Sequence, residues 1–536
     1  FRGTKAQINL GGFSNNRAGV ASAIIEHGFL KIPGLAVRLQ GTMRKGGNTK
    51  TPDYWLKNTG FKEANFSLAA AYQSNRWGIE TFYSQFNTEL GIFAGSHIGN
   101  ITDLMNAINS SEPAITSGFS YAIERPKQAV NHELWKNKIY YRLGQNRLIV
   151  EYARQYNKRQ EYDSHKAYNP NLQAQLQFEL TTQNVQSYVE HTIGRLRGIA
   201  GVAYINQTNT YEGRYFIPNF KSNAIGVYIT ESYKVSLKTK VEGGLRYDYK
   251  TVQSYYYENN VLQSPYRTFQ SPTASFGISN YLSKHSNLQT TLSTAFRPPN
   301  VNELYSNGVH HGAAAYEIGN PDLKSEHSTN LSLTLNYFFK KCFGYIHAYG
   351  YYFSNYIYLK PAFPPTLTIR GAFPTFEYTQ VRATYGGFDV AFNDSITNQI
   401  IYSTRLSLVS AYDRSQNDWL IYVPPTKWQN GIKYLIPSKG RIIKPFVSVD
   451  GIWVAHKSNT PEAGDYKAPP PAYFLLQAEI GTYLTIAKQD VLITLTGQNL
   501  LNTRYRDYLD RFRYYADAAG RNIILRLQIP LDFTKN

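Results

Sequence analysis

Residues 523–533 read IILRLQIPLDF, and this C-terminal stretch decides the fold. Apolar and mostly polar side chains alternate in it: Ile523, Leu525, Leu527, Ile529, Leu531 and Phe533 against Ile524, Arg526, Gln528, Pro530 and Asp532. Successive side chains of a β-strand point to opposite faces of its sheet, so this alternation indicates one face in an apolar medium and one in water. The stretch predicts a strand that separates hydrocarbon from an aqueous interior.

The same alternation occurs elsewhere in the chain. Residues 330–337 (NLSLTLNY) place leucines at every second position, and residues 288–296 place Leu288, Leu292 and Phe296 against small polar residues. The chain holds 45 Tyr and 28 Phe, yet its mean hydropathy is only -0.42. This combination is typical of an outer face that meets lipid between aromatic girdles and an inner face that meets water. No apolar run approaches the roughly 18 residues of a membrane-spanning helix.

An open sheet edge in hydrocarbon would leave backbone groups unpaired, so the sheet must close. Transmembrane strands need about 9 to 11 residues, and a chain of 536 residues fits about 20 to 22 of them. We therefore expect an all-β protein in which residues 1–536 form one large, closed, antiparallel transmembrane β-barrel of about 22 strands.

The connections predict the orientation of the barrel. Short polar turns at 340–343 and 487–490 contrast with the long interval 297–328. Outer-membrane barrels place short turns in the periplasm and long loops outside. Residues 503–520 should therefore be extracellular.

The formal charge of +19 comes from Lys and Arg residues that are scattered and form no dense tract. We interpret them as lumen and loop charges that attract an anionic ligand or contact outer-leaflet lipid such as lipopolysaccharide, and we expect no nucleic-acid partner. Cys342 is the single cysteine, so the chain cannot build a disulfide framework or a Cys-based metal site. The first residues, FRGTKAQINLGG, lack the features of a signal peptide.

Several motifs together resemble a known family. Residues 498–505 (QNLLNTRY) with 520–523 (GRNI) are similar to the C-terminal end of TonB-dependent receptors. Residues 296–304 (FRPPNVNEL) with 320–326 (NPDLKSE) resemble the paired boxes that flank an extracellular loop in that family, and residues 58–63 (NTGFKE) also read like a receptor barrel.

This resemblance implies a 22-stranded barrel in the Gram-negative outer membrane that encloses an N-terminal plug. It also implies uptake powered by the TonB–ExbB–ExbD complex, which acts on a TonB box before the plug, and a surface lipoprotein is a further conceivable partner. Nothing in residues 1–536 resembles a plug or a TonB box. We expect both to lie outside this chain.

The interval 297–328 carries the candidate binding residues, because loops of this length are usually functional or disordered. His310 and His311 are the candidate metal ligands, since imidazole is a common ligand for transition metals and for haem iron. In haem receptors of the family, a histidine of the corresponding loop resembles an axial ligand. Zinc receptors carry a stretch that ends in Glu-Ile-Gly-Asn-Pro, which is residues 317–321 here.

Further candidates have plainer alternatives. Tyr305 and Tyr316 would stack on a porphyrin or an aromatic chelator, or else pack within the loop, and Glu317 or Glu303 would complete a zinc site. His97 is a weaker candidate from a second long loop, and solvated histidines are the alternative throughout. The arginines at 504, 506, 511 and 513 would suit an anionic ferric chelate, or would pair with Asp507, Asp510 and Asp517.

The sequence shows no Gly-x-Ser-x-Gly elbow, no phosphate-binding Gly-rich loop and no His-Glu-x-x-His, so we do not expect an enzyme. We expect active import of an iron complex such as haem or a ferric siderophore, with no permanently bound cofactor. The alternatives are a zinc importer of the same family, a non-transporting outer-membrane receptor or assembly component, and a passive porin.

Overall fold

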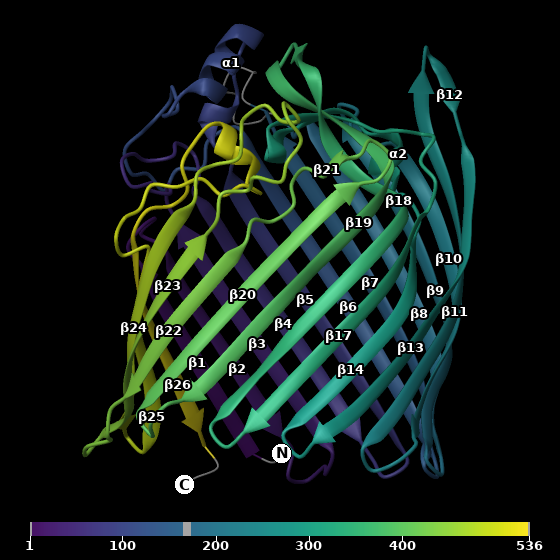
Figure 1. Cartoon of the computed structure of the whole chain (residues 1–536), viewed down its shortest axis with the longest axis vertical. Coiled ribbons are helices and arrows are strands. Elements are labelled where there is room, and N and C mark those ends of the chain that lie inside the picture. The colour runs from purple at the N-terminus through teal and green to yellow at the C-terminus, as the bar shows by residue number, and fades with distance from the viewer. Residues whose placement is uncertain (1–2, 164–172, 534–536) are drawn as a thin grey trace.

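The computed structural model describes residues 3–163 and 173–533. Within them, 22 antiparallel strands pair edge to edge, and the sheet closes because β1 (Gly3–Phe13) pairs both with β2 (Gly19–Gly28) and with β26 (Asn522–Asp532) (Figure 1). The other barrel strands are β3 (Leu35–Gly46), β4 (Phe61–Gln73), β5 (Trp77–Gly91), β6 (Lys127–Leu143), β7 (Asn146–Tyr162), β8 (Leu176–Ile193), β9 (Leu196–Gly213), β10 (Asn219–Lys234), β11 (Thr239–Glu258), β13 (Tyr266–Ser283), β14 (Ser286–Arg297), β17 (Glu326–Phe339), β18 (Cys342–Thr368), β19 (Gly371–Ser395), β20 (Ile400–Asp413), β22 (Lys427–Leu435), β23 (Ile442–Val454), β24 (Tyr473–Ile486) and β25 (Gln489–Gln498). The predicted closed barrel is confirmed.

The two faces of the barrel wall follow the predicted alternation. On β10, Ile225, Val227 and Ile229 are exposed on the outer face, whereas Ser222 is buried on the inner face. Polar pairs cross the inner face, as where Arg44 lies 3.1 Å from Glu63. No helix in the described part of the chain is long and apolar enough to cross a membrane.

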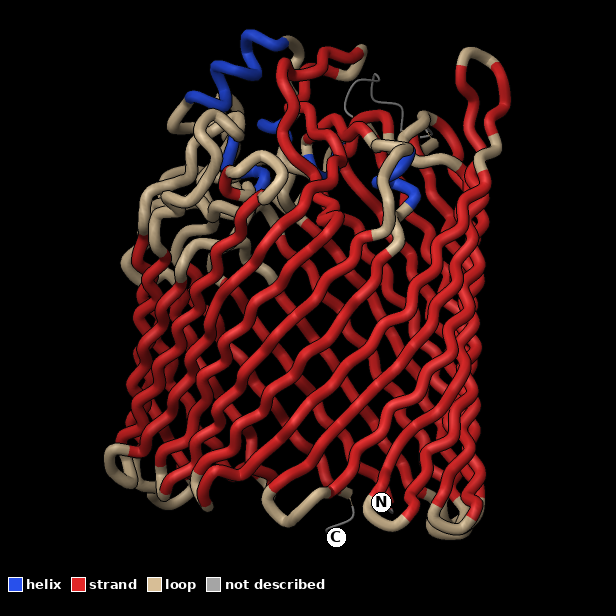
Figure 2. The backbone as a smooth tube through the Cα atoms, turned by 45° about the vertical axis from the view of Figure 1, so that its right-hand side comes forward, coloured by secondary structure: helices blue, strands red, loops and turns tan. Residues whose placement is uncertain are grey.

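The connections alternate between the two rims as the sequence predicts. Residues 340–341 and 487–488 are tight turns, and the first residues of β1 and the last residues of β26 lie at the same rim as these turns (Figure 2). The long segments 92–126, 298–325 and 499–521 all lie at the opposite rim. Since short turns face the periplasm in such barrels, the long segments are extracellular.

The extracellular segments carry the remaining elements, which rise above the barrel wall (Figure 1). They comprise the helices α1 (Ile101–Asn109) and α2 (Val301–Tyr305), the single turns η1 (Ala94–Ser96), η2 (His311–Ala313) and η3 (Arg511–Tyr514), and the short strands β12 (Val261–Gln263), β15 (Asn307–His310), β16 (Ala315–Ile318) and β21 (Asp418–Trp419).

A hydrophobic core joins these extracellular segments. We call the joined segments 92–126, 298–325, 455–472 and 499–521, with the tip of the β18–β19 hairpin, the loop cap. Its buried residues include Leu104 and Ile108 of α1, Ala315 of β16, Phe376 of β19 and Tyr515. The inner face of the wall is polar and offers little apolar surface to bury. An extensive apolar core forms instead in the cap, because loops from several parts of the chain pack there and exclude water.

Candidate functional site

Ion pairs close the base of segment 298–325, which holds most of the predicted binding residues. Arg297 at the end of β14 donates to Glu303 at 2.8 Å and to Glu326 at the start of β17 at 3.2 Å. The backbone N–H of Asn300 also donates to Glu303, at 2.7 Å, where α2 begins. The carboxylate of Glu303, weighed as a zinc ligand, is thus engaged at the base of the segment.

His310 is oriented by a buried carboxylate. β15 and β16 form a hairpin, and β16 pairs in parallel with β19 so that Glu317 lies opposite Phe376. His310 Nδ1 lies 2.9 Å from Glu317 Oε1, and the Tyr378 hydroxyl donates to Glu317 Oε2 at 3.4 Å. Glu317 is 6% exposed.

The charge state of Glu317 sets the tautomer of His310. Burial opposes ionisation of Glu317, but the hydrogen bond from His310 and the nearby Arg511 guanidinium outweigh it, so the pKa of Glu317 lies below its ordinary value. An ionised carboxylate only accepts hydrogen bonds, so neutral His310 donates through Nδ1–H and keeps its lone pair on Nε2.

His310 Nε2 lies near Gly312, a residue that lines a cavity, although His310 itself is not among the residues that line it. A Cβ added at Gly312 would lie 3.7 Å from this nitrogen, and Gly312 lines a cavity of about 330 Å³ together with Gln128 and Phe512. The side chain of His310 is 29% exposed, and its ring packs against Phe216 at 5.3 Å. The hydrogen bond with Glu317 engages Nδ1, and Nε2 lies near Gly312, one of the residues that line this cavity.

His311 faces a different set of partners, although it is adjacent in sequence. It is 1% exposed, with Nδ1 at 2.8 Å from His97 Nε2 and Nε2 at 2.8 Å from Asp163 Oδ1. The rings of His97 and His311 are stacked at 5.1 Å, and Phe373 packs edge-on against both. This contact joins segments 92–126 and 298–325 to the extracellular end of β7.

Asp163 is held as an anion in this contact. Burial disfavours its charge, but His311, Arg214 and Arg370 outweigh burial and lower the pKa of Asp163 to about 2. Arg370, from the turn between β18 and β19, donates to Asp163 at 2.8 Å. Both ring nitrogens of His311 are therefore next to protein groups in the closed cap.

The final extracellular segment contains both paired and unpaired arginines. Arg504 and Arg506 lie 2.6 Å and 2.8 Å from Asp517, as the ion-pair alternative predicts. Arg513 pairs with Asp465. Arg511 instead lies over the Phe376 ring at 4.1 Å, and it forms no ion pair with a carboxylate in the described residues.

The two candidate tyrosines are engaged in packing. Tyr305 is buried against Tyr256 at 5.3 Å, and the Tyr316 hydroxyl donates to Asn307 at 2.7 Å. Neither tyrosine lines the cavity that Gly312 lines, and His310 does not line it either. Over residues 3–163 and 173–533, no group of three or more His, Cys, Asp or Glu side chains is arranged to hold a metal ion.

Sequence reasoning missed Asp163, Tyr378 and Phe376. Each belongs to a strand end or a strand extension remote in sequence from segment 298–325, so no local pattern marks it. The one available signal was position, because Asp163 directly follows the extracellular end of β7.

Comparisons with solved structures agree with this architecture. The copper transporter OprC is 14% identical with a TM-score of 0.79, over 99% of this chain and 80% of that one. The FrpB iron transporter from Neisseria meningitidis is 13% identical with a TM-score of 0.75, over 99% and 83%. The siderophore receptor PirA from Acinetobacter baumannii is 14% identical with a TM-score of 0.70, over 99% and 81%. At these identities the likeness shows the fold.

The family assignment rests on a separate match. Residues 33–500 match the model of the family described as TonB dependent receptor-like, beta-barrel. The match covers most of the barrel, from before β3 to the end of β25, and it includes the extracellular segment with His310 and His311. The chain belongs to the TonB-dependent receptor family, the large β-barrel receptors of the Gram-negative outer membrane.

Proposed function

We propose that this chain is the barrel of an active outer-membrane importer of an iron complex such as haem or a ferric siderophore, energised through the TonB–ExbB–ExbD complex. The plug and TonB box would be supplied by residues outside this chain. Two similar structures bear the titles of an iron transporter and a siderophore receptor, which supports this class of cargo.

The observation that carries the proposal is the orientation of His310 by Glu317. Metal-binding histidines usually donate their second ring nitrogen to a carboxylate, which fixes the ring and raises its basicity. Here that bond engages Nδ1 and leaves Nε2 near Gly312, which lines a cavity. A haem iron needs a single axial nitrogen from the protein, because the porphyrin fills its equatorial positions. Of the iron complexes considered, haem makes the fullest use of this geometry.

Arg511 supplies a second element of recognition. Its guanidinium interacts favourably with Glu317, which holds His310, and it lacks an ion-pair partner in the described chain. Haem propionates and anionic ferric chelates carry carboxylates or other oxyanions that a guanidinium binds well. The cation and the imidazole both interact with one buried carboxylate, which suits a cargo that carries both a metal and negative charge.

Uptake of a free transition-metal ion such as zinc is the second candidate. His97, His311 and Asp163 form one continuous contact, and one similar structure is titled a copper transporter. A free zinc ion usually takes four ligands. His97 and His311 are in direct contact, so a metal ion would have to separate their rings.

Titration of the purified protein with ferric protoporphyrin IX, followed by absorbance, tests the proposal. His310→Ala should weaken binding by at least about 10-fold, and Glu317→Gln should weaken it by roughly 10-fold because the ring loses its orienting carboxylate. His285→Ala, in an exposed turn at the periplasmic rim, is the matched control and should bind as wild type does.

Wild-type affinity of His310→Ala would overturn the role of His310. Zinc binding that is lost in His311→Ala, without porphyrin binding, would favour the second candidate.

A further inference from the structure

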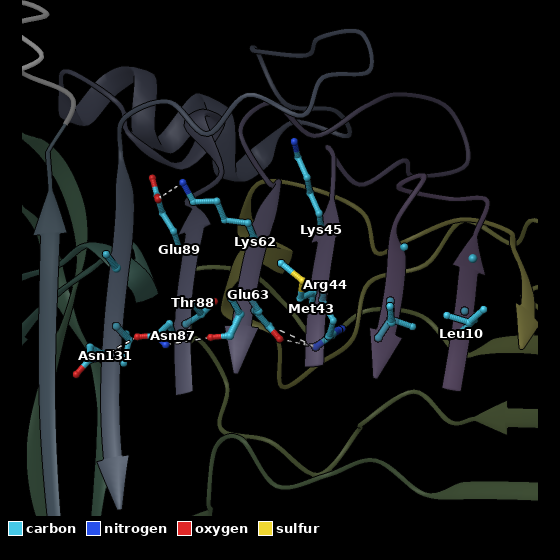
Figure 3. Close-up of a pocket in the computed structure, with 18 of the residues that line it drawn as sticks. Leu10, Met43, Arg44, Lys45, Lys62, Glu63, Asn87, Thr88, Glu89 and Asn131 are labelled. Carbon is cyan, nitrogen blue, oxygen red and sulfur yellow. Dashed lines mark hydrogen bonds and ion pairs between the residues drawn. The ribbon is translucent and has the colours of Figure 1, made fainter. Parts of the chain in front are cut away.

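The outer wall of β1 to β7 contains a groove near the extracellular rim. Its volume is about 870 Å³, and it crosses several neighbouring strands (Figure 3). Several of the positions that face outward along it are small: Gly12, Gly19, Ala21, Ala64 and Ala129. A run of side chains this small leaves a hollow where other parts of the wall carry large apolar groups.

Strand register shows that the groove lies on the lipid-facing side. Leu10 pairs with Ala21, Ala21 with Met43, and Met43 with Ala64, so these four side chains lie on one face of the sheet. Met43 is 68% exposed, as expected for a side chain that meets lipid. The neighbouring Arg44–Glu63 pair belongs to the opposite, luminal face.

The extracellular margin of the groove is cationic. Lys45, Lys62 and Lys158 line it, and Lys127 lies next to it. Glu89 is shared by Lys62 at 2.6 Å and Lys127 at 2.7 Å. Lys158 lies 3.3 Å from Glu179. Four lysines thus face two carboxylates, which leaves positive charge above the groove.

Lys45 is the cation most available to a ligand. Its ammonium group lies 5.2 Å from the Tyr121 ring, and within the described part of the chain it has no carboxylate partner. It is adjacent in register to Lys62, so the two ammonium groups come from neighbouring strands (Figure 3). Lys62 already pairs with Glu89, so Lys45 is the ammonium group whose charge remains for a bound anion.

The middle of the groove is polar in a way that fits the boundary of a membrane. Asn131 donates to Asn87 at 2.6 Å, and Asn87 donates to the carbonyl of Ala64 at 3.0 Å (Figure 3). Each of these side-chain amides has a second N–H, which would be costly to leave unpaired in hydrocarbon. At headgroup level it can donate to ester or sugar oxygens. Leu525, Leu527, Leu10 and Met43 make the adjoining part apolar.

We propose that this groove is a binding site for one acylated lipid with a phosphate headgroup. The acyl chain lies over the small and apolar side chains, and the phosphate is held by Lys45 and Lys62. Toward the extracellular rim, the surface of the groove changes from apolar to amide-rich to cationic. This order matches an amphiphile whose headgroup carries a net negative charge, and not one whose headgroup is zwitterionic. The proposal is independent of the imported cargo, since the groove lies outside the barrel.

Native mass spectrometry tests the site. The purified protein is first incorporated into mixed membranes of phosphatidylglycerol and phosphatidylcholine. Wild type should retain one phosphatidylglycerol. Ala64→Phe fills the groove and Lys45→Glu reverses its charge, so each should reduce retention by about 10-fold. Ala274→Phe and Lys221→Glu change exposed outer-wall positions on β13 and β10 and should leave retention unchanged. All four variants should keep the wild-type melting temperature within a few degrees.

Two results would overturn the proposal. One is equal retention of phosphatidylglycerol in the groove variants and their controls. The other is equal retention of phosphatidylcholine by wild type, which would show that charge plays no part. A third contrary result combines two observations: millimolar inorganic phosphate displaces phosphatidylglycerol, and Ala64→Phe has no effect on its retention. This would indicate an anion site with no acyl-chain groove, and it would equally contradict the proposal.

Discussion

His310 and His311 carry the same side chain in different surroundings, and the difference decides their chemistry. His310 ends β15, where the hairpin places Glu317 against its Nδ1 and leaves Nε2 near Gly312, which lines a cavity. His311 begins η2 and is enclosed by His97, Asp163 and Phe373. Residue type and loop length predicted both as metal ligands. The choice between them depends on partners from β7 and β19, which no pattern within the loop specifies.

Replacement of Asp163 tests the buried contact at the residue scale. Asp163→Asn removes the anion that faces His311 and Arg370, and we expect the loop cap to open more easily by about 2 kcal/mol at neutral pH. Amide hydrogen exchange in residues 92–126 and 298–325 measures this opening. Asp53→Asn, an exposed position in another extracellular loop, is the control. Unchanged exchange in Asp163→Asn would contradict the assigned contact.

The same carboxyl group predicts an acid dependence. Its pKa of about 2 lies below the ordinary value of 3.8, so its stabilisation is fully present above pH 3.8 and is lost as the pH falls toward 2. Hydrogen exchange in the two segments should therefore accelerate between about pH 4 and pH 2 in wild type, beyond the intrinsic pH effect. This added acceleration should be absent from Asp163→Asn. An identical acid profile in both proteins would contradict the prediction.

At the scale of elements, strands were predictable and the cap was not. Alternation and turn residues located β14, β17 and β26 and the two rims, because each strand separates two solvents along its own length. The β18–β19 hairpin departs from expectation: β18 spans Cys342–Thr368, far beyond a transmembrane strand, because its extension pairs with β19 in the cap, where β19 also pairs with β16. Helix α1 and hairpin β15–β16 are stabilised by contacts between loops that are distant in sequence.

Gly371 at the tip of this hairpin is an element-scale test of cap packing. Its φ is +121°, and a Cβ there would lie 2.4 Å from the carbonyl oxygen of Ile98. Gly371→Ala should raise proteolytic cleavage in residues 92–126 several-fold, because strain and clash together cost roughly 2 kcal/mol or more. Gly144→Ala has a φ of +63° with open space around it and should cost about 1 kcal/mol without exposing the cap. Equal cleavage in both variants would refute a cap held by this contact.

The outer face of β11 allows a second test at this scale. Leu245 is 64% exposed on the wall, whereas Leu262 is 53% exposed on β12, in the hairpin that rises above the barrel (Figure 1). Leu245→Arg should destabilise the protein in lipid by about 2–4 kcal/mol, and Leu262→Arg should have little effect. Urea unfolding in phospholipid vesicles measures the difference. Similar free energies of unfolding would mean that Leu245 does not face hydrocarbon.

On the scale of the whole molecule, closure and capping have separate physical causes. Pairing of β1 with β26 removes the last free edge, a requirement that follows from hydrocarbon alone and was therefore predictable from sequence. The loop cap forms because several loops share one apolar core above a polar lumen. His310 belongs to this cap, so the proposed cargo would meet its binding residue within the cap itself.

Uptake of iron-labelled haem by cells that express the receptor tests this account most directly. Wild-type cells should accumulate label, His310→Ala should reduce the initial rate by at least about 10-fold at limiting haem, and dissipation of the proton-motive force should abolish uptake in both. His285→Ala should import at the wild-type rate at equal surface abundance. Import by His310→Ala at the wild-type rate, or uptake that persists without the proton-motive force, would contradict the account.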